Sequence, residues 1–144
     1  EKFLQKKSAE MFMSVWSDSV QNAECLSAMG EYGDMEFAYH ISCVLDEEDL
    51  GRVVLRKELL FYHQVLEDAM DHLLQALFAL NHCYFPSRKK TKNYLESFSR
   101  VPENCYAKLE TIIQKSVRRE TIEESVQELR KITEDIMNLS IYTV

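Results

Sequence analysis

Polar side chains capable of acid–base chemistry share one edge of an expected helix in the middle of the chain. Arg56, His63 and Glu67 are spaced seven and four residues apart, which places them on the same side of an α-helix. An imidazole beside a carboxylate can transfer protons, and burial raises the pKa of a glutamate. Glu58 lies one residue off this edge. We therefore take His63, Glu67 and Glu58 as candidate catalytic residues and Arg56 as a candidate substrate contact; the alternative is an ion-paired rim of a helix bundle.

A second polar cluster follows about twenty residues later. Asn81 and Tyr84 supply an amide and a phenol, and Arg88, Lys89 and Lys90 place three cations at an expected helix start. A helix N-terminus beside cations is an arrangement that binds anions. These five residues are candidate substrate or phosphate contacts. The alternative is a solvated basic helix that balances an acidic surface.

Motifs of a self-contained enzyme do not occur in the sequence. It has no Gly-rich phosphate loop, no G-x-S-x-G, no H-E-x-x-H and no D-x-D pair of magnesium-binding carboxylates. The cysteines Cys25, Cys43, Cys83 and Cys105 lack C-x-x-C spacing, so we expect free thiols and no metal site. We therefore expect that this chain alone is inactive.

Composition predicts a single all-α domain. The 144 residues include only 3 Gly and 2 Pro, too few for the turns of a β-sandwich. The net charge of -7 disfavours nonspecific binding to nucleic acid. No apolar run approaches the roughly 20 residues of a membrane span, and free thiols are typical of a reducing compartment. We expect a cytoplasmic protein whose residues 1–144 form one domain.

Helical periodicity predicts an up-and-down bundle of five or six helices. One helix over Leu50–Tyr84 would span about 50 Å, so we expect a kink near Gly51 or a break near Arg56. The acidic run over residues 46–49 either ends one helix or opens the next. The expected elements run over Lys2–Met29 (stopped by Gly30 and Gly33), Asp34–Leu45, Leu50–Tyr84 and Ser87–Phe98, with further helices opened by Pro102 and by a Thr121/Glu124 capping box. The inward-facing residues expected on them are Phe37, Ile41, Val44, Leu45, Leu59, Tyr62, Leu66, Ala69, Leu73, Leu77, Leu80, Tyr84, Leu109, Ile112, Ile113, Val117, Ile122, Val126, Leu129, Ile132 and Ile136.

The most distinctive stretch of the sequence carries a family resemblance. Residues 77–90 read L-F-A-L-N-H-C-Y-F-P-S-R-K-K, and P-E-N-C follows at residues 102–105. They resemble the helical C-terminal domain of bacterial minimal nucleotidyltransferases, a domain similar to that of kanamycin nucleotidyltransferase. The likeness covers residues 50–115 and implies a helical domain that completes a substrate cleft with an N-terminal catalytic domain.

The resemblance also implies a division of labour between two domains. In that family the N-terminal α/β domain supplies a G-S motif and the carboxylates that hold magnesium and the NTP, and nothing similar occurs in this sequence. We therefore expect the chain to be the C-terminal part of a longer protein. The aminoglycoside enzymes of the group take a Glu base and a phosphate-contacting Lys from the helical domain, for which Glu58, Glu67, Lys89 and Lys90 are the candidates. A cationic second substrate would match the net charge of -7.

Two other functions remain open at this point. The chain could be an interaction module that docks another protein or forms a homodimer through an apolar helix face. Alternatively, the R-x6-H spacing of Arg56 and His63 resembles the ribonuclease motif of HEPN helical domains, although Lys57 stands where that motif usually has a polar residue such as Asn.

Overall fold

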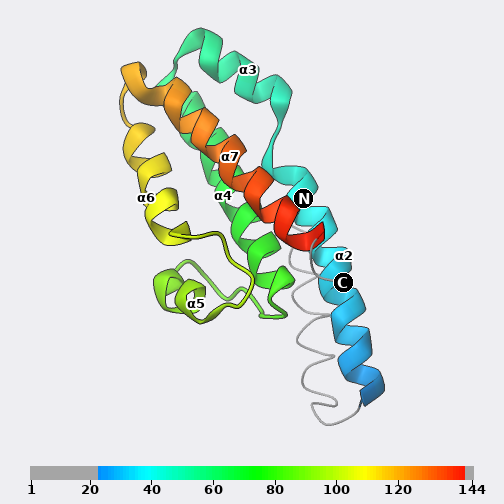
Figure 1. The fold of residues 1–144 in the computed structure, drawn as a ribbon. Helices are drawn as coiled ribbons and strands as arrows, with labels where there is room; N and C mark the ends of the chain where they lie inside the picture. The colour runs from blue at the N-terminus through cyan, green and yellow to red at the C-terminus, as the bar shows by residue number, and fades with distance from the viewer. Residues whose placement is uncertain (1–22, 142–144) are drawn as a thin grey trace.

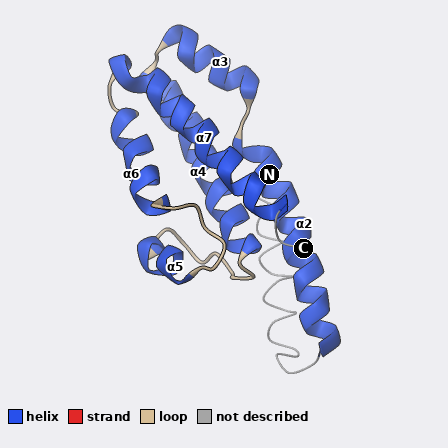
Figure 2. Ribbon diagram, in the orientation of Figure 1, coloured by secondary structure: helices blue, strands red, loops and turns tan. Residues whose placement is uncertain are grey.

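The computed structural model describes residues 23–141 of the chain, with side chains over residues 33–140. These residues form α-helices, one short 3-10 helix and no strand, which confirms the predicted all-α bundle. The bundle consists of α2, α4, α6 and α7, which run alternately up and down, and α3 crosses one end of them while the short α5 lies toward the other (Figure 1). Figure 2 shows the same arrangement coloured by secondary structure. The elements are α2 (Ala23–Val44), α3 (Glu47–Arg56), α4 (Leu59–Leu80), α5 (Thr91–Ser97), α6 (Cys105–Lys115), η1 (Arg119–Thr121) and α7 (Ile122–Ile141).

Helix α2 passes through two glycines that were expected to stop a helix. Gly30 and Gly33 both lie inside α2, so the predicted helix end at Gly30 and the predicted helix start at Asp34 are wrong. Gly33 has a packing role instead, because a Cβ there would lie 3.1 Å from Nδ1 of His82 and 3.2 Å from the carbonyl oxygen of Ala79. The missing side chain therefore lets α2 approach the end of α4 closely. The rest of the expected Lys2–Met29 helix, up to residue 22, lies outside the described residues.

The acidic run opens a helix, and the long helix expected over Leu50–Tyr84 is divided. Asp46 caps α3, since its carboxylate accepts a 3.0 Å hydrogen bond from the backbone N–H of Asp49. The break predicted near Arg56 is confirmed: Lys57 adopts a left-handed conformation with φ 52°, and α4 begins two residues later. Helix α4 ends at Leu80 rather than at Tyr84.

The shorter C-terminal elements begin later than the sequence predicts. Helix α5 begins at Thr91 rather than at Ser87, and α6 begins at Cys105, three residues after Pro102. Thr121 ends η1 and its hydroxyl donates to the carbonyl of Lys115 at 2.6 Å, an arrangement different from the predicted capping box. Pro102 therefore does not open α6, whereas α7 begins at Ile122, directly after Thr121 as predicted.

The core forms around α4, which α2 and α7 flank. Nearly all the predicted inward-facing residues are buried or pack against the core. Ile113 and Val117 are exceptions, because both are about half exposed. On α4, the buried Tyr62 hydroxyl lies 2.6 Å from Oγ of Ser125, which in turn donates to the carbonyl of Ile112 at 2.7 Å. This chain of hydrogen bonds joins α4, α7 and α6 in the interior.

Candidate functional site

The structure brings Glu67 of the first predicted cluster and Arg88 of the second together in an ion-paired group. Nη1 of Arg88 lies 3.0 Å from Oε2 of Glu67, and its Nη2 lies 2.7 Å from Oδ1 of Asp71. The guanidinium also donates to the backbone carbonyl of Glu67 at 3.2 Å. Arg88 thus fixes the segment after α4 to the side of that helix, and its donors and the Glu67 carboxylate already have partners in this state.

His63 and Arg56 lie on different helices. Arg56 ends α3, whereas His63 is in the second turn of α4, so the R-x6-H spacing does not fall on one helix. Nε2 of His63 lies 3.0 Å from the carbonyl oxygen of Ser116, a geometry in which the ring N–H donates. Glu58 is the exposed N-cap residue of α4 and makes no side-chain capping bond. These residues therefore do not form a shared catalytic centre around Glu67, and their catalytic roles stay predictions.

Asn81 has a structural partner for each of its polar atoms. Its Nδ2 donates to the carbonyls of Leu77 and Arg100, both at 2.8 Å, and its Oδ1 accepts from the backbone N–H of Arg100 at 3.0 Å. The amide therefore ties the end of α4 to the loop before α6. Tyr84 is half-buried.

Lys89 and Lys90 are exposed and precede α5 rather than lying within it. Lys90 has a left-handed conformation with φ 58° at the start of α5. Because α5 is only seven residues long, it lacks the extended dipole that the predicted anion site required.

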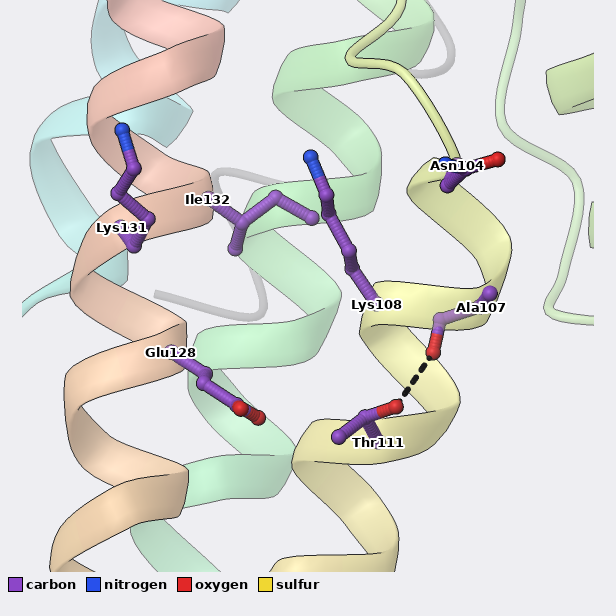
Figure 3. Close-up of a pocket in the computed structure, with 7 residues that line it drawn as sticks. All are labelled: Asn104, Ala107, Lys108, Thr111, Glu128, Lys131 and Ile132. Atoms are coloured by element: carbon purple, nitrogen blue, oxygen red, sulfur yellow. Dashed lines mark hydrogen bonds between the residues drawn. The ribbon is translucent and has the colours of Figure 1, made fainter.

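A pocket between α6 and α7 was not predicted from the sequence. Its volume is about 360 Å³. Side chains from both helices line it, with apolar Ile132 on one wall (Figure 3). The lining residues are Asn104, Ala107, Lys108, Thr111, Glu128, Lys131 and Ile132.

Glu128 gives this pocket an acceptor without a protein partner. Its Oε1 is bound by Nζ of Lys115 at 2.7 Å, and Lys115 also pairs with Glu124 at 3.2 Å. Its Oε2 is buried and has no hydrogen-bond partner among the described residues. The buried phenol of Tyr62 also senses Glu128. Burial raises the pKa of Tyr62, its hydrogen bond with Ser125 lowers that pKa, and the charge of Glu128 raises it. A buried carboxylate oxygen of this kind is an acceptor for an ammonium, amide or hydroxyl group of a ligand.

The other end of the pocket carries cations. In Figure 3 the amines of Lys108 and Lys131 both point away from Glu128. They lie 4.0 Å and 3.0 Å from the two carboxylate oxygens of Asp135. Asn104 is the N-cap residue that directly precedes α6; it has φ 55°, a left-handed conformation that Asn tolerates, and makes no side-chain capping bond. The pocket therefore has an acidic end and a basic end, and Asn104 from the P-E-N-C motif lines it.

A buried histidine pair is a second feature that sequence reasoning missed. His40 on α2 and His72 on α4 are each 1% exposed, and their Nδ1 atoms lie 3.1 Å apart. Nε2 of His40 also lies 3.1 Å from a carboxylate oxygen of Glu36. In the sequence, His40 lies beside Phe37 and Ile41, which were predicted to face inward. This position was the available signal that His40 is buried. The pair joins α2 to α4 inside the bundle. Neither histidine lines the α6–α7 pocket.

Comparison of the chain with protein-family models, curated proteins and solved structures finds no match. Within residues 23–141, no group of three or more His, Cys, Asp and Glu side chains is placed to hold a metal ion. No helix in this part of the chain combines the length and the apolar character needed to cross a membrane.

Proposed function

We propose that this chain is the substrate-binding helical domain of a nucleotidyltransferase, and that its α6–α7 pocket binds an amine-bearing small molecule. The observation that carries the proposal is the buried Oε2 of Glu128, which has no hydrogen-bond partner among the described residues. An ammonium group of a ligand would supply the missing donor to this oxygen. The net charge of -7 favours the approach of such a cation.

The segment that resembles the nucleotidyltransferase domains has a defined structural role, which supports the proposal. Phe78 makes edge or tilted ring contacts with Phe85, Tyr94 and Phe98 at centroid distances of 5.0, 5.2 and 4.9 Å. Together with the hydrogen bonds of Asn81, these contacts fix the loops that lead to Asn104 at the pocket. The unusual residues of the motif thus hold in place the segment that leads to Asn104 at the edge of the pocket.

Magnesium and the nucleotide are assigned in this proposal to a catalytic domain outside the chain. Magnesium requires several oxygen ligands, and the described residues offer no group of carboxylates that fits it. The chain itself would orient the amine-bearing substrate and exclude water at the α6–α7 pocket. Glu58, Glu67, Lys89 and Lys90 stay candidates for contacts at the interface with that domain. A cytoplasmic location follows from the same proposal.

Calorimetric titration tests the pocket assignment. We expect kanamycin to bind the 144-residue chain, and Glu128→Gln to weaken this binding by at least about tenfold because the ammonium loses its charged partner. Glu124→Gln is the matched control, since Glu124 also pairs with Lys115 but does not line the pocket. Absence of heat at millimolar kanamycin, or equal binding by both variants, would contradict the pocket assignment.

The nucleotidyl-transfer part has a separate test. We expect the polypeptide encoded immediately before Glu1 to contain a strand, a Gly-Ser turn and two spaced Asp residues. We also expect the joined protein to transfer labelled nucleotide from an Mg-NTP to an amine-bearing acceptor. A different upstream sequence would remove the transferase assignment while leaving the binding result intact.

A further inference from the structure

Large apolar side chains are exposed at one end of the bundle. Leu55 is 83% exposed and Leu60 is 90% exposed, on either side of the turn between α3 and α4. Ile113 and Val117, at the end of α6, are 49% and 53% exposed. An apolar group of this kind is a common feature of protein-binding surfaces.

Contacts in the bundle place these residues at the same end. His63, one turn after Leu60 on α4, is hydrogen-bonded to the carbonyl of Ser116 at 3.0 Å. Val117 follows Ser116 directly, and Ile113 lies one helical turn before it. Figure 1 shows the α3–α4 turn, the end of α6 and the start of α7 together at this end, at the upper left of the view.

The same end is locally basic in an acidic protein. Arg56 and Lys57 follow Leu55, and Arg118 and Arg119 follow Val117. All four cations are exposed, and no ion pair of theirs is found within the described residues. Glu58 and Glu120 are interspersed among them in the sequence, and Glu123 and Glu124 follow in the first turn of α7. We call this surface the basic apolar end; it consists of Leu55, Arg56, Lys57, Leu60, Ile113, Val117, Arg118 and Arg119.

We propose that the basic apolar end docks an acidic amphipathic helix of a partner protein. The leucines and their neighbours would contact the apolar face of that helix, while the arginines would pair with carboxylates at its edges. Arginine beside exposed apolar side chains is the composition typical of the centre of protein interfaces. This inference does not depend on the transferase assignment or on the α6–α7 pocket.

The charge of the basic apolar end distinguishes an acidic partner protein from a second copy of the chain and from a nucleic acid. A symmetric dimer through the same end would bring the cations of two copies together, which is unfavourable. A nucleic acid would meet the cations but would leave the exposed leucines in water, and the net charge of -7 would oppose its approach. A partner that is both acidic and apolar satisfies both properties of the surface.

Selection from a phage library of random helical peptides on the full 144-residue chain tests the proposal. We expect the recovered peptides to carry apolar residues at helical spacing, flanked by Asp and Glu. Their binding, measured by fluorescence anisotropy, should weaken at least about tenfold in Leu60→Asp and in the double variant R118E/R119E. It should also weaken as the salt concentration rises.

Met137→Asp is the matched control, because Met137 is 48% exposed on α7 outside the basic apolar end. It should leave peptide binding within about twofold of the original chain. Circular dichroism should show that Leu60→Asp folds, since Leu60 is exposed. The proposal is overturned if no acidic peptides are enriched or if Leu60→Asp binds them equally. It is also overturned if Leu60→Asp abolishes self-association or RNA binding instead, since a second copy or a nucleic acid would then be the occupant.

Discussion

His40 and His72 contact each other through their Nδ1 atoms, 3.1 Å apart, in the interior between α2 and α4. At this distance one ring must donate and the other must accept, so protonation of both nitrogens would place two donors against each other. The His40 ring also contacts a carboxylate oxygen of Glu36 at 3.1 Å, which orients it. The pair therefore joins α2 to α4 by a buried polar contact as well as by apolar packing.

The first prediction concerns this pair. His72→Ala should lower the free energy of unfolding by about 2–4 kcal/mol, because it leaves a cavity and removes the partner of a buried ring nitrogen. Urea unfolding followed by circular dichroism measures the change. Gln64→Ala, at an exposed site on the same helix, is the control and should change stability by about 0.5 kcal/mol or less. Equal stability of the two variants would show that the pair contributes nothing to the fold.

A second prediction distinguishes a structural from a substrate-binding role for Asn81. Asn81→Asp replaces two donated hydrogen bonds, to the carbonyls of Leu77 and Arg100, by a carboxylate facing those carbonyls. We expect a loss of about 2–4 kcal/mol of stability, compared with about 1–3 kcal/mol for Asn81→Ala. Asn93→Asp, exposed on α5, is the matched control. If Asn81→Asp unfolds at the same urea concentration as this control, the amide does not tie α4 to the loop.

The sequence predicted the helices well, but it misplaced several of the residues at which they begin and end. The apolar stripes of α4 and α7 are strong periodic signals, and their residues are buried as expected. The two glycines of α2 misled the prediction, because Gly33 is required for close packing against His82 and Ala79, which are distant in sequence. Lys57 ends α3 in a left-handed conformation that no sequence signal at that residue indicates.

The candidate site was harder to predict because its geometry depends on tertiary contacts. Periodicity placed Arg56 and His63 on one helix edge, and the break at Lys57 separates them. Arg88 pairs with Glu67, a residue from the other predicted cluster 21 positions away. The acceptor oxygen of Glu128 stands out only when the packing of α6 against α7 is known. A spacing argument within one helix contains none of this information.

The third prediction concerns the pH dependence of stability. Cys105 is 4% exposed, and burial raises the pKa of its thiol from 9.0 to about 11, with Lys108 opposing this slightly. Well below pH 9 the Cys105 thiol is neutral in both the folded and the unfolded chain. As the pH rises from 9 toward 11, the thiol ionises first in the unfolded chain, and this ionisation stabilises the unfolded state. The chain should therefore lose about 2–3 kcal/mol of stability across this range.

The control for this pH dependence is Cys105→Ala, because Tyr62 also has a raised pKa and titrates at high pH in both proteins. Urea unfolding at several pH values between 8.5 and 11 should show that the original chain loses more stability than the variant. Parallel curves for the two proteins would show that the Cys105 thiol ionises as readily in the folded chain as in the unfolded one.

The fourth prediction concerns the ion pairs of Arg88. The guanidinium is 39% exposed, so its bonds to Glu67 and Asp71 are screened by water, and Arg88→Ala should cost only about 0–1 kcal/mol of stability. A double-mutant cycle with Asp71→Asn should give a coupling energy of about 0.5–1 kcal/mol that decreases at high salt. Arg88→Ala could leave stability nearly unchanged but weaken binding of an Mg-NTP by the joined transferase. In that case Arg88 leaves Glu67 and Asp71 and contacts the phosphates when the nucleotide binds. If stability falls by more than about 3 kcal/mol, the residue is a structural tie, and its predicted phosphate contact is wrong.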